Sequence, residues 1–545
     1  MPQDFEAQLS AATNAILLSR SARRLVVAGP GTGKTTTFRL LLEHEQAQPD
    51  QRLVLTFINN LKAELVGKLG HLSKVMTFHG YCHQLLRQKS SLRQGLLDEF
   101  RYFPPLPSLV KADWELIHDG QAAPRIVDLM RKAEVCADTA FYLERSDYYD
   151  AVAFDDSVFR VWQRLCDDPD EIEEYALIVV DEYQDFNRLE ATFIGLLATK
   201  SRIVVAGDDD QALYSRLRGS TPQFIRGLHR DPDYDKFELP FCQRCTEVII
   251  HAVDDIVQRA VRARRLQGRI NKTFLHYPPR KAADSERYPK IRMVEASVQN
   301  NQANYFGKYI SREIARIPGD EISESRQEGF PTVLVIGPGQ YLRQIQSCLE
   351  RDGYTIEVKE SSDSMVIDRK QGLAILKGDA QANLGWRIVL EADQPSFIND
   401  VIRRAYSKNA PLVDGLPAEY RERIMIEAEA WREESLEISG DAALPQEGPE
   451  RPTIKLASFE GSKGLSAQHV FIVGLQEGEL PHDANNIDDL EICKLIVALT
   501  RTRKQCHLIY TKRWGGVVKR PSVFISWILP QRIQLVRVDR NYWDR

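Results

Sequence analysis

Short apolar runs that end directly in polar residues recur along the chain. Residues 24–28 read RLVVA, residues 175–180 read YALIVV, and residues 202–206 read RIVVA. Apolar runs of this kind are typical of strands that are buried on both faces of a sheet. Because glycine, acidic or amide residues follow each run, the pattern predicts a parallel sheet with a functional site along its carboxyl edge.

The first apolar run leads into a glycine-rich turn. Residues 28–35 read AGPGTGKT, and residues 35–45, TTTFRLLLEHE, are predicted to form a helix. The glycines let backbone N–H groups turn inward around phosphate oxygens, while the lysine reaches the outer phosphates and a threonine hydroxyl holds magnesium. The turn therefore predicts a site for ATP, with these binding residues: Ala28, Gly29, Pro30, Gly31, Thr32, Gly33, Lys34, Thr35 and Thr36.

The second and third runs end in acids. Residues 175–180 are followed by Asp181 and Glu182, and the third run leads to Asp208 and Gln211. In a phosphate site, an aspartate of this kind holds the magnesium shell and the glutamate is placed to activate the attacking water. The sequence thus predicts Mg²⁺ ligands at Thr35 and Asp181 and a base at Glu182.

Length and composition narrow the class of protein. The 545 residues predict several domains, and 43% hydrophobic with 27% charged residues is an ordinary globular composition. No apolar run is long enough to cross a bilayer, and the first residues, MPQDFEAQLS, contain no apolar segment of a secretory signal. We therefore expect a cytoplasmic protein with no membrane partner.

Charge and cysteines give weaker indications. The net charge of -5 does not suggest a generally basic nucleic-acid binder, although a local groove can hold phosphates on an acidic protein. Residues 501–520 are basic and contain no acid, which fits a solvated face and a strip of phosphate contacts equally well. Cys242 and Cys245 form a lone CxxC, and without a second ligand pair we interpret them as buried thiols rather than a zinc site.

An ordered series of segments resembles the motifs of superfamily one DNA helicases of the UvrD/Rep/PcrA group. The glycine-rich turn looks like motif I, VVDEYQD (179–185) like motif II, and AGDDDQALY (206–214) like motif III. The resemblance implies an α/β fold with two RecA-like parallel-sheet cores of the P-loop NTPase class and small, mostly helical insertions. The remaining motifs occur in the family's order, with Ia at 54–65, Ib at 75–87, IV at 239–249, V at 454–481 and VI at 495–510.

The resemblance also implies an activity and a division of labour. The chain would be an ATP-dependent DNA helicase or translocase that moves 3′-to-5′ on single-stranded DNA or on a 3′-tailed duplex. Arg244 of motif IV and Arg501 of motif VI would reach ATP from the second core, and an arginine of this kind contributes ~10³–10⁵ in rate. Gln211 and Asp185 would sense the outer phosphate, so that hydrolysis is coupled to opening and closing of the cores.

The same motifs imply DNA contacts, because bases stack on aromatic faces and phosphates bind polar side chains. Phe57, Phe78 and Tyr214 occupy the positions of stacking residues. The residues expected to reach phosphates or sugars are Thr56, Asn59, Thr77, His79, Ser462 and Lys463.

Several positions depart from the family pattern. Thr13 stands where the family has its adenine-reading glutamine, which leaves adenine selectivity open. No tryptophan follows Tyr214, and Ser466 replaces the acid after Lys-Gly-Leu. These changes affect expected DNA and base contacts rather than the hydrolytic set, so we expect altered DNA handling with ATP hydrolysis retained.

The motifs also predict a layout. The first core would comprise residues 1–88 and 149–238, with a small accessory insertion at 89–148. The second core would comprise residues 239–360 and 447–545, with a reduced helical insertion at 361–446. The proline-rich segment 276–289 is predicted to be a surface loop.

Three functions remain open at this point. The first is a helicase or translocase in DNA repair or replication restart. The second is an ATP-gated subunit of an antiviral defence complex that regulates a partner nuclease, as the compact build resembles the helicase subunits of Gabija anti-phage systems. The third is a P-loop ATPase that binds no nucleic acid, which the segments similar to motifs Ia, Ib and V disfavour.

Overall fold

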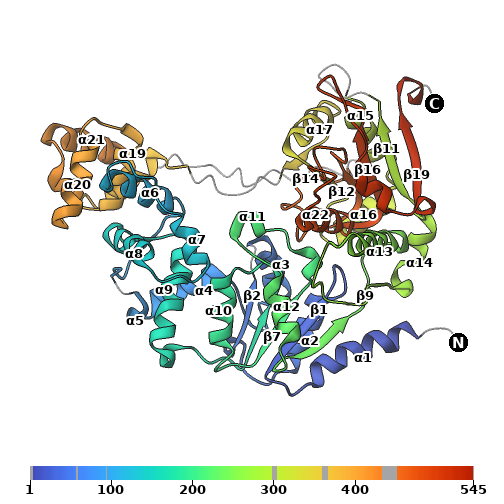
Figure 1. The fold of residues 1–545 in the computed structure, drawn as a ribbon, viewed down its shortest axis with the longest axis horizontal. Helices are drawn as coiled ribbons and strands as arrows, with labels where there is room; N and C mark the ends of the chain where they lie inside the picture. The colour runs from blue at the N-terminus through green and yellow to red at the C-terminus, as the bar shows by residue number, and fades with distance from the viewer. Residues whose placement is uncertain are drawn as a thin grey trace.

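Two β-sheets covered by helices organise the chain (Figure 1). The computed structural model describes residues 4–56, 59–93, 95–297, 304–358, 366–431 and 451–543. The first sheet has the strand order β3-β2-β6-β7-β1-β8 and the second has the order β13-β14-β12-β15-β16-β11-β19. All strand pairs in both sheets are parallel, as the apolar runs predicted.

The first sheet is covered on both faces because its inner strands β6, β7 and β1 are buried and almost entirely apolar. Leu25 and Leu53 lie in one hydrophobic cluster, whereas their neighbours Val26 and Val54 lie in another on the opposite face. Helices α1 (Phe5–Leu18), α2 (Lys34–His44) and α3 (Asn59–Leu69) cover one face, and α4 (Phe78–Gln88), α9 (Phe154–Asp167) and α10 (Arg188–Leu197) cover the other. The strands are β1 (Arg23–Ala28), β2 (Arg52–Thr56), β3 (Lys74–Thr77), β6 (Leu177–Val180), β7 (Ile203–Gly207) and β8 (Asp235–Leu239).

The second sheet follows the same plan. Leu334 and Ile336 face α13 (Glu247–Arg262) and α22 (Asp489–Leu499), while Val333 and Val335 face α15 (Tyr305–Ile314) and α17 (Gly339–Arg351). Its strands are β11 (Ile291–Ala296), β12 (Val333–Ile336), β13 (Ile356–Val358), β14 (Ile454–Ala457), β15 (Ala467–Ile472), β16 (Thr502–Thr511) and β19 (Ile533–Val538).

Shorter elements connect and flank the sheets. Among the described residues, no helix combines the length and apolarity needed to cross a membrane. The elements are β4 (Arg101–Tyr102), β5 (Ala151–Val152), β9 (Phe241–Cys242), β10 (Leu275–His276), β17 (Arg513–Trp514), β18 (Val517–Val518), α11 (Ser215–Arg218), α12 (Gln223–Arg230), α16 (Gly319–Gln327), and the 3₁₀ turns η3 (Tyr183–Asp185) and η4 (Asp209–Gln211).

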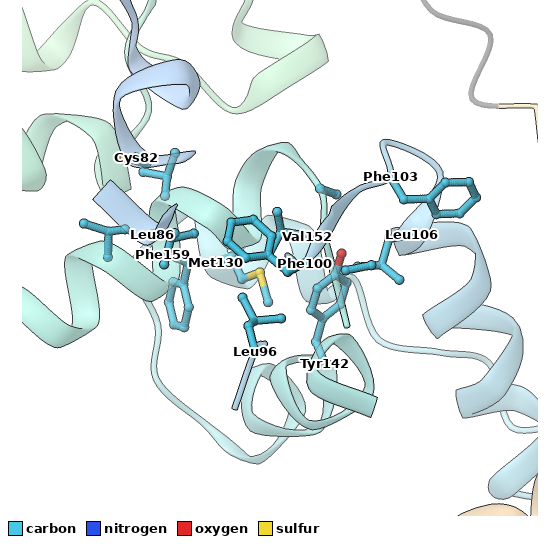
Figure 2. Close-up of a cluster of buried hydrophobic side chains, with 14 of the residues drawn as sticks. Cys82, Leu86, Leu96, Phe100, Phe103, Leu106, Met130, Tyr142, Val152 and Phe159 are labelled. Atoms are coloured by element: carbon cyan, nitrogen blue, oxygen red, sulfur yellow. The ribbon is translucent and has the colours of Figure 1, made fainter. Parts of the chain in front are cut away.

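Two helical segments lie away from the second sheet and against each other (Figure 1). The first segment continues the hydrophobic core beside α4 and α9, and Figure 2 shows Leu96, Phe100, Met130 and Tyr142 among the side chains that fill it. The second segment joins the same hydrophobic cluster through residues such as Trp386. The helices are α5 (Ser90–Arg93), α6 (Leu106–Ile117), α7 (Ile126–Arg131) and α8 (Ala137–Tyr149), then α18 (Arg369–Gly378), α19 (Asn383–Asp393), α20 (Ile398–Lys408) and α21 (Ala418–Ala430).

A buried carboxylate joins the two helical segments. Asp113 of α6 accepts hydrogen bonds from Arg145 of α8 at 2.8 Å and from Arg387 of α19 at 2.8 Å, and Tyr149 donates a third at 2.6 Å. Burial alone would raise the pKa of Asp113, but Arg387 and Arg145 outweigh it and hold the pKa below its usual value. The second helical segment is therefore held on the first by an ionic contact that is closed to solvent.

The predicted surface loop at 276–289 is wrong, because residues Pro278–Arg287 form helix α14. The two prolines stand in its first turn, where a missing N–H costs nothing and the fixed φ angle suits a helix. A proline pair thus begins a helix here, although the same residues often mark a loop.

Candidate nucleotide site

The glycine-rich turn between β1 and α2 is shaped to surround an anion. Gly31 and Gly33 have φ angles of 72° and 93°, in the left-handed region that favours glycine. A Cβ atom on Gly31 would lie 2.5 Å from the Cβ of Arg244, so no side chain fits there. Helix α2 begins at Lys34 with Gly33 as its N-cap, which aims free N–H groups and the positive end of the helix at the turn.

Hydrogen bonds within the turn hold its shape. The Thr32 hydroxyl donates to the Gly29 carbonyl at 2.9 Å, and Lys34 Nζ donates to the Ala28 carbonyl at 3.4 Å. The ring of Phe274 lies against Gly29, where an added Cβ would meet it at 2.8 Å. Thr35 and Thr36 line the space in front of the turn.

The acid pair at the end of β6 lies opposite this turn. Glu182 Oε1 is 3.1 Å from Lys34 Nζ, and Glu182 has a φ angle of 55°, which is rare outside glycine. Burial and the neighbouring Glu182 raise the pKa of Asp181 to about 7. Burial would also raise the pKa of Glu182, but the Lys34 and Lys463 ammonium groups outweigh it and hold the pKa well below its usual value. One acid of the pair is thus strongly ionised.

Lys463 is part of this charge cluster, which corrects its expected contact with DNA. Its Nζ lies 3.0 Å from Glu182 Oε2, pairs with Asp185, and donates to the Gln211 carbonyl at 3.0 Å. The side chain is 2% exposed, so a nucleic-acid phosphate outside the protein does not reach it. Ser462 is also buried, and its hydroxyl donates to the Phe459 carbonyl at 2.7 Å. It therefore does not reach the surface where a DNA phosphate was expected.

Two arginines reach the site from residues beyond the first sheet. Arg501 Nη2 donates to Gln211 Oε1 at 3.2 Å, and Arg244 Nη1 donates to the Thr500 carbonyl at 3.4 Å. Burial first, and the proximity of Arg244 second, lower the pKa of Arg501 to about 9. The structure therefore brings together the predicted residues Lys34, Asp181, Glu182, Gln211, Arg244 and Arg501 around one cavity of about 700 Å³.

The cavity has basic walls that the sequence motifs did not single out. Lys68 and Arg280 line it, as does Arg503, which lies in the basic stretch noted at 501–520. Arg503 also pairs with Glu328. The clustering of positive side chains beside a P-loop suits a polyanionic ligand.

Cys242 and Cys245 support the position of Arg244. Both thiols are buried, and Cys245 Sγ donates to the Thr500 carbonyl at 3.6 Å. Burial would raise the pKa of Cys242, but a hydrogen bond from Cys245 outweighs it and lowers the pKa to about 7. Within the described part of the chain, neither cysteine belongs to a cluster with three or more potential metal ligands.

Thr13, at the position of the family's adenine-reading glutamine, lies on α1 and is not among the residues that line the cavity. Helix α1 instead packs Phe5 against Phe241, with ring centroids 5.8 Å apart.

Most of the residues expected to contact DNA at the first sheet are instead buried or form hydrogen bonds within the protein. Phe78 is fully buried with its ring 5.1 Å from Phe193, so it offers no face to a base. The Thr77 hydroxyl caps α4 by accepting from the Gly80 N–H at 3.1 Å, and Thr56 is fully buried at the end of β2. Phe57 lies outside the described residues, as does the side chain of Asn59.

His79 and Tyr214 differ from these buried residues. His79 is partly exposed, but its Nε2 atom is buried, and burial together with Arg218 lowers the pKa of the ring to about 3. Its ring meets Phe154 edge-on at 5.2 Å, so packing accounts for its position. Tyr214 is partly exposed, and its hydroxyl donates to the Glu460 carbonyl at 3.2 Å. Glu460 lies in the loop that follows β14 of the second sheet.

Comparison with known proteins gives matches over part of the chain. Residues 11–216 match a family described as an AAA domain. The ATP-dependent DNA helicase PcrA of Staphylococcus aureus is 29% identical over 278 residues, which cover 43% of this chain and 38% of that protein. PcrA of Staphylococcus epidermidis is 28% identical over the same shares of the two chains.

The match therefore spans well under half the length of these relatives. The matched AAA domain is consistent with the parallel sheet and the glycine-rich turn before α2 that the structure contains. The fold, the glycine-rich turn and these matches together show a chain that is similar to PcrA-type ATP-dependent DNA helicases, with residues 11–216 similar to an AAA domain.

Proposed function

We propose that the chain is an ATP-driven motor that moves 3′-to-5′ along single-stranded DNA. We call the part of the protein built on the first sheet the first half, and the part built on the second sheet the second half. The observation that carries the proposal is the 3.2 Å contact between Arg501 of the second half and Gln211 of the first half, at the edge of the cavity. A site that draws residues from both halves changes with their separation, which is what coupling of hydrolysis to movement requires.

The cavity residues fit ATP and a divalent ion. The Gly33 N-cap and Lys34 present N–H groups and an ammonium to phosphate oxygens. The Thr35 hydroxyl and the Asp181 carboxylate are hard oxygen donors of the type that Mg²⁺ takes, and they would hold it. Bound there, the ion would neutralise charge on the phosphates.

The other residues of the cavity have roles in phosphoryl transfer that follow from their charge. Glu182 is ionised and accepts a proton from the attacking water, and Lys34 keeps that carboxylate beside the turn at 3.1 Å. Arg501 and Arg244 carry positive charge toward the transferring phosphoryl group, where negative charge accumulates in the transition state. Gln211 contacts Arg501 and so registers whether both halves are in place.

Single-stranded DNA is the proposed track, and a 3′-tailed duplex the proposed substrate for unwinding. Support comes from the matched relatives, which are named ATP-dependent DNA helicases. Tyr214 also lies where the two halves meet, with its hydroxyl on the Glu460 carbonyl and Lys463 Nζ 5.9 Å from its ring centre. An aromatic ring at that junction is placed to move with the nucleotide site.

Steady-state ATP hydrolysis with and without single-stranded DNA tests this proposal, with Glu182→Gln as the blank. Strong stimulation by the strand supports a DNA-coupled motor, and unwinding of 3′-tailed against 5′-tailed duplexes then tests polarity. If single-stranded DNA leaves the rate of ATP hydrolysis unchanged or lowers it, the proposal of a DNA-coupled motor is wrong. That result favours a nucleotide-gated subunit that regulates a partner nuclease in antiviral defence, and co-purification with a nuclease would test it.

A further inference from the structure

A cluster of six charged side chains, each at most 15% exposed, lies at the end of β7, beside Gln211. The aspartates of the sequence DDDQ supply the negative charges, and Lys272 touches all three of them at 2.5, 2.7 and 2.8 Å. Arg226 of α12 and Arg269 supply the other positive charges, each 2.8 Å from its carboxylate partner. The three carboxylates are Asp208, Asp209 and Asp210.

Lys272 is the centre of this cluster. Burial would lower the pKa of its ammonium, but the three carboxylates outweigh burial and raise the pKa instead, so the lysine is charged. Among the residues the structure describes, the three aspartates also form the sole group of three or more His, Cys, Asp or Glu side chains whose ligand atoms lie close together. Because Lys272 Nζ already lies among their oxygens, the group is an ion-pair site rather than a metal site.

A short path leads from Lys272 to the nucleotide cavity. Lys272 Nζ is 2.5 Å from Asp208 Oδ1, and the other oxygen of that carboxylate accepts from Gln211 Nε2 at 2.9 Å. This fixes the Gln211 amide with its nitrogen toward Asp208 and its oxygen toward Arg501 Nη2, 3.2 Å away. The lysine is thus connected through Asp208 to an amide that it does not touch.

Lys272 lies on a segment that connects the two halves of the protein. Leu266 is packed in the core of the second sheet, and its N–H donates to Asp489 of α22 at 3.0 Å. Four residues later, Ile270 is packed in the core of the first sheet, and its N–H donates to Asp209 at 2.9 Å. A shift of one half against the other therefore acts on this segment and on the lysine that follows it.

We propose that Lys272 is a positioning residue for hydrolysis, which acts through Asp208 to aim the Gln211 amide at Arg501. The inference rests on the proposed function, because it assumes that Gln211 takes part in ATP turnover. When the connecting segment moves, the Lys272–Asp208 contact changes and the amide loses its fixed orientation. The junction between the halves is thereby linked to the nucleotide site by a second route, separate from the arginines.

The main test compares Lys272→Met with Arg269→Met as a matched control. Both substitutions remove one positive charge from the same cluster, but Arg269 pairs with Asp210, whereas the Gln211 amide donates to Asp208. We expect Lys272→Met to lower kcat roughly tenfold or more, because the Asp208 carboxylate that accepts from Gln211 loses its charged hydrogen-bond partner. KM for ATP should stay within about twofold in both variants, and kcat in Arg269→Met likewise. Equal kcat in the two variants overturns the proposal.

Buried charge removal can prevent folding, so a second pair of variants keeps the cluster neutral. Asp208→Asn/Lys272→Met and Asp210→Asn/Arg269→Met each remove one carboxylate and one cation, and removing both partners of a buried pair is far milder than removing one. We expect the first pair to lose turnover and the second to retain it, with similar melting temperatures. Similar turnover in these two double variants also overturns the proposal.

A double-mutant cycle with Gln211→Ala separates this inference from the proposed function. If Lys272 acts through Gln211, Lys272→Met should have little further effect on kcat when Gln211 is already alanine. Independent, multiplying losses would show that Lys272 acts by another route and would overturn the positioning role. If Gln211→Ala alone leaves kcat unchanged in an active protein, the premise fails, and with it this inference, while the motor itself stands.

Discussion

Lys463 Nζ lies 3.0 Å from Glu182 Oε2, on the carboxylate whose other oxygen is 3.1 Å from Lys34 Nζ. Two ammonium groups from opposite halves of the protein thus share one acid. Lys463 also pairs with Asp185, so its single charge lies between two buried carboxylates. The second half thus contributes a positive charge beside the P-loop through Lys463, in addition to its arginines.

Lys463→Met should lower ATP turnover by roughly 10²-fold, a loss typical of one preorganised donor in an active site. The physical reason is that Glu182 and Asp185 lose a counter-charge in a buried site, which disfavours the ionised base. DNA affinity and its dependence on salt should not change, because the side chain is closed to solvent. Fluorescence anisotropy with labelled single-stranded DNA across a salt series measures this. If the variant instead shows a weaker dependence of DNA affinity on salt together with normal ATP turnover, Lys463 contacts a DNA phosphate, as its motif predicts.

Arg501→Ala should leave ATP binding within a few-fold but reduce turnover by about 10³-fold or more, the range of an arginine that stabilises phosphoryl transfer. Arg501 contacts Gln211 rather than the glycine-rich turn itself, so its loss acts on the reaction more than on binding. Nucleotide titration and single-turnover hydrolysis separate the two effects. Exposed Arg513→Ala is the control. A loss of only a few-fold in Arg501→Ala would remove it from the role of arginine finger.

Arg387→Met should release the second helical segment from the first. Asp113 would keep Arg145 but lose its partner from α19, and removing one member of a buried ion pair costs about 3–5 kcal/mol. Hydrogen exchange should then rise in α19 and α20 while β1, β6 and β7 keep their protection. The exposed Arg404→Met on α20 serves as control. An unchanged exchange pattern would mean that apolar packing and the other polar contacts, such as that of the Tyr148 hydroxyl with the Ala410 carbonyl, hold the segments together without Arg387.

Parallel sheets and the P-loop could be predicted because their signals are local. Apolar runs followed by polar residues gave β1, β6 and β7, and glycine spacing gave the turn before Lys34. A glycine at position 31 is required both by its φ angle and by the approach of Arg244, but only the first requirement could be inferred from sequence.

Contacts between distant segments could not be predicted in this way. Asp113 and Arg387 are 274 positions apart, and nothing near either residue indicates that they pair. Motif position likewise does not specify which way a side chain points, so Phe78 and Lys463 were expected at the DNA although both are buried. The proline pair that begins α14 shows the same limit at short range, since one signal fits both a loop and a first helical turn.

Stability of the second sheet should fall as the pH falls below about 6.5, because of buried His507. Its ring stacks on Phe471 with centroids 4.2 Å apart, and its Nδ1 and the Tyr309 hydroxyl are 2.9 Å apart. Burial first, then Arg292 and His469, lower the pKa of the ring well below its usual value. The folded protein therefore keeps His507 neutral while the unfolded chain binds a proton below pH ~6.5, which shifts the balance toward unfolding by at most ~1.4 kcal/mol per pH unit.

Hydrogen exchange of β16 amides at pH 7 and pH 5, after correction for intrinsic rates, measures this dependence. His507→Phe should reduce the loss of protection between the two pH values, whatever its effect on protection at pH 7. The change in slope is the diagnostic quantity, because losing the Tyr309 hydrogen bond lowers stability at every pH. His251→Gln on the exposed face of α13 is the matched control and should leave the slope as it is. An equal slope in His507→Phe and the unaltered protein would assign the acid sensitivity of this sheet to other groups.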